Sequence, residues 1–386
     1  MRSRRLAVLD IGSDVITLIV QDSKNANNIL FKGSKTYAGY GQGWFFNEEG
    51  LFNSLRSLIR ECRIIAGAPE HILIGVPAEF STAICKNIST SFYSRREITS
   101  DDIDSLLSRG DVYKKHPTYR SVCHFPVNYL LEDGIETMYP VGKTSSTLAA
   151  TVSYVLADRR FIDFFNAIAN VLNTKFEYTS SVQSEILHII PPDVRDEGIL
   201  LLDIGYISSV LAYARGDGIV HMASFSLGLG HIAGYLWQYI DMPFNHALAL
   251  SHKLNLNLFS DDDDTYSIAI NNKSYVYKIK TVNEIACYAL NLITNTVKNA
   301  LLSASGIIPT YTPILLTGSG ISDAIGAKEF ISKETSRHVT IIKPSSIQFD
   351  KPSQSSMVGL LREQNRIYQK QKSNIRRFFE SFWRKK

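Results

Sequence analysis

The sequence has few cysteines, no long apolar run and little net charge, and each of these shortages excludes a class of protein. Its cysteines are isolated from one another, so they form neither a CxxC redox pair nor a paired-thiolate zinc knuckle. The nine histidines are scattered, without HExxH spacing, and we expect no metal site. We interpret the cysteines as reduced core thiols: Cys62, Cys85, Cys123 and Cys287.

No stretch approaches the roughly 18 consecutive apolar residues of a membrane span, and the first residues lead directly into a strand-like run without a signal-type apolar core. We therefore expect a protein that stays in the cytoplasm. The 41 Lys and Arg against 37 Asp and Glu give a formal charge of only +4, which argues against binding nucleic acid through bulk charge. We expect no nucleic acid partner.

With 386 residues and 45% hydrophobic composition, the chain is long enough for two domains or one duplicated architecture. An internal repeat favours the duplicated architecture. Residues 8–13 and 201–206 are apolar runs that end in Asp-Ile-Gly, and each is followed by a second β-rich run. One copy would be explained by Asp serving a turn before Gly, but two copies half a chain apart favour a duplicated α/β fold.

A third glycine turn lies at residues 313–321, where an apolar strand leads into Thr-Gly-Ser-Gly and a plausible helix follows from Ala324 to Ile331. Backbone N–H groups at such turns can bind phosphates and ribose rings, because glycine lets the chain approach closely. None of the three turns matches GxGxxG or GxxxxGK[ST], so Rossmann and Walker-type sites fit poorly.

Between the repeats, Thr99 with Asp102 three residues later predicts a capped helix flanked by strands, which indicates a small α+β insertion. In the second half we expect a helix from Pro243 to Leu254, an acidic loop at residues 261–264 and a hairpin around residues 267–279. A long helix over residues 282–303 follows, with a core-facing stripe at Ala286, Leu290, Ile293, Val297 and Leu301.

The last residues have the pattern of an interfacial anchor. Ile375, Phe378, Phe379, Phe382 and Trp383 form one apolar stripe of a helix, beside Arg376, Arg377, Arg384, Lys385 and Lys386. A helix docked on the protein's own surface and a partner-binding helix remain alternatives. From Arg362 onward there are nine basic and two acidic residues, so the other 361 residues carry 32 basic against 35 acidic ones. The near-neutral total thus combines a slightly acidic body with a strongly basic tail, suited to anionic lipid.

Together, the two Asp-Ile-Gly modules, the Leu-Thr-Gly-Ser-Gly turn and the insertion resemble the actin-like ATPase superfamily, and within it the bacterial cell-division protein family FtsA. The insertion, with Glu97-Ile98-Thr99, His124-Phe125-Pro126 and Pro140-Val141-Gly142, is similar to the subdomain of FtsA and its pilus-assembly relative PilM. The resemblance implies a duplicated, two-lobed actin-like α/β fold with an FtsA/PilM-type insertion and a C-terminal amphipathic helix.

The implied domains are a first lobe at 1–80, the insertion at 81–175, and a second lobe at 176–363 with a hairpin and helix subdomain at about 244–303. A flexible linker at 364–374 and a membrane-targeting helix at 375–386 follow. The resemblance also implies an ATP and Mg²⁺ site formed by two phosphate loops and an adenosine loop. Its residues would be Asp10, Gly12, Ser13, Asp203, Gly205, Gly228, Gly318, Ser319 and Gly320.

Several positions of that site depart from the family pattern. Tyr206-Ile207 stands where small residues are usual in the second phosphate loop, and apolar residues replace charged ones at 232–235 and 247–251. We therefore expect weak or absent ATP binding, at most a weak ATPase, and we assign no catalytic residue.

By resemblance, the protein would polymerise at the cytoplasmic side of the membrane at the division site and tether FtsZ filaments there. The FtsZ C-terminal tail would dock on the long helix, where Asn291, Asn295 and Lys298 share one face; an ordinary polar face explains them equally well. A PilM-like pilus-assembly adaptor is the first alternative. A sugar-kinase-type phosphotransferase is the second, although that branch lacks the insertion and we find no catalytic Asp for it.

Overall fold

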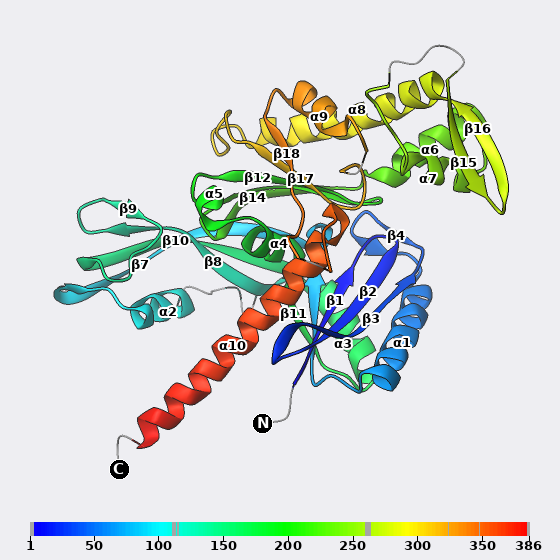
Figure 1. Cartoon of the computed structure of the whole chain (residues 1–386). Helices are drawn as coiled ribbons and strands as arrows, with labels where there is room; N and C mark the ends of the chain where they lie inside the picture. Colours follow the sequence, from blue (N-terminus) through cyan, green and yellow to red (C-terminus); the bar gives the residue numbers. More distant parts are fainter. Residues whose placement is uncertain are drawn as a thin grey trace.

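The computed structural model describes residues 4–109, 113, 116–258, 264–322, 324–346 and 348–383, of which residues 26–27 and 374–383 are described as backbone only. Two five-stranded sheets form the centres of two lobes, and a four-stranded sheet lies beside them (Figure 1). The predicted mixed α/β class and two-lobed arrangement are confirmed.

The first lobe is built on a sheet in which alternate residues of one strand face opposite layers. Ala7 and Leu9 pack with helices α1 (Glu48–Ile65) and α3 (Arg159–Val171), whereas Val8 faces helix α10 (Ser355–Trp383). The strand order is β11-β6-β1-β2-β3. The strands are β1 (Arg5–Ile11), β2 (Val15–Asp22), β3 (Asn25–Thr36), β6 (Ile72–Val76) and β11 (Phe176–Ser180), with the short β4 (Tyr40–Gly41) and β5 (Trp44–Phe45) nearby.

The second lobe repeats this topology, which confirms the duplication. Strand β12 pairs antiparallel with β13 and parallel with β17, as β1 pairs with β2 and β6. Its strand order is β14-β13-β12-β17-β18. The strands are β12 (Ile199–Ile204), β13 (Ser209–Arg215), β14 (Gly218–Phe225), β17 (Ile314–Thr317) and β18 (Val339–Ile341). The covering helices are α4 (Ser181–Ile189), α5 (Pro192–Asp196), α6 (Leu229–Ile240) and α9 (Ala327–Thr335).

The insertion is a sheet of order β7-β10-β8-β9 with helix α2 (Ser100–Arg109) against it. The predicted cap is present, because the Asp102 N–H donates to Oγ1 of Thr99 and the Thr99 N–H donates to the Asp102 carboxylate. The strands are β7 (Ser81–Glu97), β8 (Tyr119–Leu131), β9 (Glu136–Thr137) and β10 (Thr144–Asp158), and the 3₁₀ turn η1 (Ala78–Phe80) precedes them.

Two elements lie on the other side of the predicted domain limits. Helix α3, expected in the insertion, places its apolar face in the core of the first lobe, and β11, expected in the second lobe, completes the first-lobe sheet. Both follow from the parallel pairing of β11 with β6, which brings the chain back into the first lobe after the insertion.

The outer part of the second lobe contains α7 (Phe244–Ser251), the hairpin β15 (Thr265–Ile270) and β16 (Lys273–Lys278), and the long helix α8 (Ile279–Ser303). The predicted hairpin and long helix are confirmed, and four of the five stripe residues of α8 are buried. Asp261–Asp263 of the acidic loop lie outside the described residues. Helix α9 begins later than predicted, because Gly326 before it has φ of 85°, outside the right-handed helical region.

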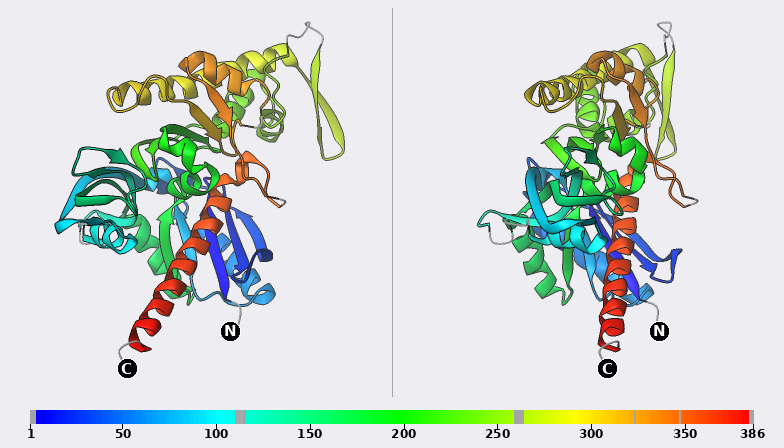
Figure 2. Two further views of the ribbon diagram at one scale, coloured as in Figure 1. Left: turned by 60° about the vertical axis from the view of Figure 1, so that its left-hand side comes forward. Right: turned by 90° about the vertical axis from the view of Figure 1, so that its left-hand side faces the viewer.

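Helix α10 crosses the first lobe and extends past it, following the 3₁₀ turn η2 (Pro352–Gln354) (Figure 2). The flexible linker predicted for 364–374 is instead part of this helix. No Gly or Pro follows Gly359, and Glu363 accepts a hydrogen bond from His188 of α4 and another from Arg366 one turn along α10, so the polar composition does not interrupt the helix. Among the helices within the described ranges, we find none long and apolar enough to cross a membrane.

Candidate functional site

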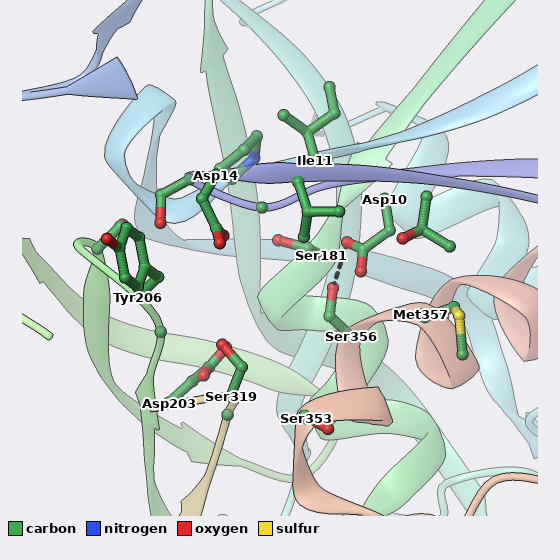
Figure 3. Close-up of a pocket in the computed structure, with 18 of the residues that line it drawn as sticks. Asp10, Ile11, Asp14, Ser181, Asp203, Tyr206, Ser319, Ser353, Ser356 and Met357 are labelled. Carbon is green, nitrogen blue, oxygen red and sulfur yellow. Dashed lines mark hydrogen bonds between the residues drawn. The ribbon is translucent and has the colours of Figure 1, made fainter. Parts of the chain in front are cut away.

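A cleft of about 280 Å³ lies between the lobes, where the two repeated turns meet. The turn after β1, the turn after β12 and the loop after β17 contribute to it, as the repeat predicts. Helix α4 and the segment from η2 to the start of α10 form the remaining wall. Figure 3 shows Asp10 and Asp203 in this cleft, with Ser356 beside Asp10.

Most of the predicted nucleotide-contacting residues line this cleft: Asp10, Gly12, Ser13, Asp203, Gly205, Gly318 and Ser319. Gly228 and Gly320 do not line it but lie behind the second turn. A Cβ atom at Gly228 would lie 2.3 Å from the carbonyl oxygen of Gly205, and one at Gly320 would lie 2.6 Å from the same atom. These two glycines therefore allow the second turn to pack closely against its neighbours.

Three carboxyl groups are concentrated at the floor of the cleft. Burial and, to a lesser extent, the nearby Asp10 together raise the pKa of Asp203 to about 7. Burial also raises the pKa of Asp10, although hydrogen bonds from Ser356 and from the Ile11 N–H oppose this, and it raises the pKa of Glu185, with added repulsion from Asp203 and Asp10. The floor thus favours protonated carboxyls or a bound cation.

The start of α10 contributes directly to this floor. Oγ of Ser356 donates a hydrogen bond of 2.7 Å to Oδ1 of Asp10, across 346 residues of sequence (Figure 3). Pro352, Ser353, Gln354 and Met357 line the same wall. The helix that carries the basic tail therefore begins in contact with an acidic residue of the cleft.

The two repeated turns are hydrogen-bonded to each other across the cleft. The Ile207 N–H donates to Oγ of Ser13 at 3.1 Å, and the Ile207 side chain packs against the core of the first lobe. A second bridge lies nearby, where Ser226 donates to Glu79 at 2.6 Å. The backbone N–H groups that a phosphate would need in the second turn are therefore partly used within the protein.

Tyr206, the residue before this contact, lies on the side of the cleft where Asp14 is found (Figure 3). Its ring packs against the start of α6, because a Cβ atom at Gly230 would lie 3.1 Å from Cε2 of Tyr206. Burial raises the pKa of Tyr206, and Asp14 raises it further. The large side chain is accommodated over a glycine, in a position where the resemblance implies a small residue.

The sequence did not identify Glu185, Asp14 or Ser356 as site residues. Glu185 had a visible signal, since it is a carboxylate on the short helix α4, most of whose other residues are apolar or small. Its Oε2 atom is buried and makes no hydrogen bond to the described residues. Asp14 and Ser356 had no comparable signal, because a polar residue in a turn or at a helix start usually faces solvent.

The cleft suits ATP only in part. Glycine turns allow close backbone approach, but the described lining residues include four carboxylates, Asp10, Asp14, Glu185 and Asp203, and a single basic side chain, Lys32. Within the described residues no group of three His, Cys, Asp or Glu is arranged to hold a metal ion. A triphosphate would meet mostly acidic side chains and a hydrogen-bonded turn, so these residues do not fit ATP well.

The other predicted site residues lie away from the cleft. Lys298 on α8 pairs with Glu334 of α9 at 3.1 Å, while Asn291 is half-buried and Asn295 is exposed. For the predicted membrane segment, Ile375, Arg376, Arg377, Phe378, Phe379, Phe382 and Trp383 are described as helical backbone only, and Arg384, Lys385 and Lys386 lie outside the described residues.

Comparison with solved structures places this architecture among known folds. A PilM–PilN type IV pilus biogenesis complex aligns with a TM-score of 0.60 at 12% identity, over 92% of this chain and 97% of that one. MreB 5 of Spiroplasma citri bound to AMPPNP aligns with a TM-score of 0.54 at 11% identity, over 98% and 99% of the two chains.

EutJ, an ethanolamine utilization protein from Carboxydothermus hydrogenoformans, aligns with a TM-score of 0.53 at 11% identity, over 94% of this chain and 90% of that one. The chain has the actin-like fold. No protein-family model matches the sequence, and no curated protein sequence matches it either. The cleft described above lies between the two lobes of this fold. The duplication of the lobes explains why the turns after β1 and β12 share one motif.

Proposed function

We propose that this chain is an actin-like scaffold that self-associates on the cytoplasmic face of the membrane, anchored by its basic C-terminal segment, and that it tethers FtsZ filaments at the division site. The observation that carries the proposal is the path of α10. This helix starts in the cleft at the contact between Ser356 and Asp10, crosses the first lobe, and leads without a break into the basic and aromatic segment 375–386.

A continuous helix transmits the orientation of the body to the segment it carries, which a flexible linker would not do. The basic residues supply about 1 kcal/mol each near an anionic leaflet, and the aromatic side chains add apolar burial. One copy would therefore bind reversibly, and several tails on one polymer would bind stably through avidity. The cleft contributes as a joint between the lobes, with nucleotide bound weakly if at all.

The test is co-sedimentation with vesicles of phosphatidylglycerol and phosphatidylethanolamine, using the full chain and a version that ends before Ile375. The full chain should pellet with vesicles, less so as salt is raised, and the shortened chain should stay in solution. Equal pelleting of both proteins would contradict the anchor. Pelleting of full-length protein without vesicles, measured across protein concentrations, reports self-association separately.

The FtsZ partner is tested with an immobilised FtsZ C-terminal peptide. We expect the full chain to be retained and the triple variant Asn291→Ala, Asn295→Ala, Lys298→Ala to be lost from the resin. Because Lys298 pairs with Glu334, the single variant Glu334→Ala serves as a control for changes in that pair alone. Unchanged retention of the triple variant would remove this helix face as the docking site.

A PilM-like adaptor is the second candidate, favoured by the alignment with the PilM–PilN complex over nearly the whole chain. In that case the partner would be a peptide of a pilus membrane protein. A pull-down that compares the FtsZ C-terminal peptide with a PilN N-terminal peptide separates the two candidates, since each predicts retention by one peptide only.

A further inference from the structure

The edge of the first lobe from which α10 emerges exposes an unusual group of large apolar side chains. Ile64 and Ile65 at the end of α1 are 75% and 67% exposed, and Val171 at the end of α3 is 72% exposed. The two helix ends are tied together, because Nη2 of Arg63 donates to the carbonyl oxygens of Leu172 and Asn173 at 2.6 and 2.9 Å. The three exposed side chains therefore lie at the same end of the first lobe, and we call them the basal patch.

Sheet topology places the basal patch at the same edge as the N-terminal strand. β1, β6 and β11 run parallel, with Ala7 aligned with Ile72 and Ile72 aligned with Phe176, so the residues that precede these strands share one edge. Arg5 reaches the α1–β6 connection directly, since a Cβ atom at Gly67 would lie 3.0 Å from its Cζ atom. The basal patch and the strand starts are thus neighbours.

The edge that bears the basal patch carries more basic than acidic side chains. Five basic side chains and three acidic ones lie at this edge. The basic ones are Arg4, Arg5, Lys24, Arg63 and Lys175, and the acidic ones are Asp22, Glu70 and Glu177. Glu70 lies 3.9 Å from Arg4 and Glu177 lies 3.6 Å from His71, so the acidic groups balance only part of the charge. Apolar side chains at a basic edge match the headgroup region of an anionic bilayer.

Helix α10 passes the same edge. Ile367, Tyr368 and Gln371 line a pocket together with Arg4 and Glu70, and the helix continues to Trp383 beyond them. In both views of Figure 2 the start of β1 and the end of α10 lie toward one side of the molecule, as they do in Figure 1. A membrane that receives segment 375–386 would therefore also face the basal patch.

We propose that the basal patch is a second membrane-contacting surface, which inserts Ile64, Ile65 and Val171 among the headgroups of an anionic bilayer while α10 supplies the first contact. This inference rests on the proposed membrane anchoring. Two contacts fix the orientation of the body against the bilayer completely, whereas α10 alone leaves the body free to rotate about the helix axis.

The experiment compares the full chain with the double variant Ile64→Asp, Ile65→Asp in the vesicle assay described above. Because both side chains are exposed, the variant should fold normally, and vesicle affinity should fall by about tenfold. The control is Leu302→Asp, Ile307→Asp, which adds the same charge at exposed apolar positions of the second lobe and should bind like the unaltered chain. Val171→Trp should tighten binding, because tryptophan favours the headgroup region.

Three outcomes overturn the inference, and they are distinguishable. Failure of the unaltered chain to bind vesicles removes both the anchor and the patch. Loss of binding on truncation before Ile375, combined with full binding by the Ile64 and Ile65 variant, removes the patch and leaves the anchor. If the unaltered chain forms larger species without vesicles and this variant abolishes them, the patch is a contact between copies of the chain.

Discussion

The backbone N–H of Ile207 donates a 3.1 Å hydrogen bond to Oγ of Ser13, and this contact joins two turns that are 194 residues apart in the sequence. Each turn follows the same Asp-Ile-Gly motif in its own lobe. The duplication places the turns opposite each other. Tyr206-Ile207, which stands where the resemblance implies small residues, joins them. The protein's own groups therefore bridge the two turns at one side of the cleft, where the resemblance implies that phosphates would lie.

Removing the large side chains of the second turn should open this point. We predict that the variant Tyr206→Gly, Ile207→Gly binds a fluorescent ATP analogue with Mg²⁺ at least about tenfold more tightly than the unaltered chain, as judged by fluorescence anisotropy. The variant Ser13→Ala removes the acceptor but keeps both side chains, and should change affinity less. Sub-micromolar binding by the unaltered chain would show that the bridged turns do not hinder nucleotide binding.

The buried Asp203 predicts a pH dependence of stability. Its pKa in the folded protein, about 7, lies above the ordinary value of 3.8. The buried charge therefore lowers the free energy of unfolding, and this destabilisation reaches its full size above pH 7. This destabilisation fades as the pH falls through 7 and is absent below about 4. Asp203→Asn should therefore stabilise the fold by roughly 2 kcal/mol more at pH 8 than at pH 5, as measured by urea unfolding.

The matched control for this measurement is Asp163→Asn, which changes an exposed carboxylate on α3. It should show nearly the same effect at both pH values. An equal effect of Asp203→Asn at pH 5 and pH 8 would show that the pKa of Asp203 is not raised in the folded protein.

The sequence predicted the parts of the fold that depend on local pattern. Alternating or continuous apolar runs marked β1 and β12, and Asp before Gly marked the turns that meet in the cleft. It could not predict that Ser356 reaches Asp10, because that contact joins opposite ends of the chain. Nor could composition show that residues 364–374 are helical, since Glu363 ties the preceding turn of this helix to His188 on α4.

The hydrogen bonds of Glu363 predict that removing its side chain destabilises the protein. Glu363 is 2% exposed and accepts hydrogen bonds from His188 at 2.9 Å and Arg366 at 2.7 Å. Burial would raise the pKa of Glu363, but these partners outweigh it and hold the pKa at about 2. Glu363→Ala removes both hydrogen bonds and leaves the largely buried His188 without its carboxylate partner, so it should lower the free energy of unfolding by about 2 kcal/mol.

The same helix offers a control, because Lys370 and Asp104 form a 3.0 Å ion pair in which both side chains are more than half exposed. Lys370→Ala should cost less than about 0.5 kcal/mol. The folded-state pKa of Glu363 lies below its ordinary value of 4.5, so its stabilisation is complete above that pH and is lost as the pH falls towards 2. The difference between the unaltered chain and Glu363→Ala should accordingly shrink between pH 6 and pH 3.

Two helical glycines allow a paired test of how closely α10 crosses α4. A Cβ atom at Gly359 would lie 2.8 Å from the carbonyl carbon of Ser184 and 2.9 Å from the backbone nitrogen of Glu185, whereas one at Gly234 in α6 would meet no atom within 4 Å. Alanine favours helices over glycine, so Gly234→Ala should stabilise the protein by about 0.5–1 kcal/mol.

At Gly359 the same propensity gain is opposed by contact with backbone atoms that cannot rotate away. We expect Gly359→Ala to destabilise the fold by about 1–3 kcal/mol in urea unfolding, since α10 must move outward from α4. The displacement would also move Ser356 away from Asp10, three residues earlier in the same helix. If both variants stabilise the protein to a similar degree, α10 does not cross α4 as closely as described. The hydrogen bond from Ser356 to Asp10, which links the cleft to the helix that carries the basic tail, would then lose this support.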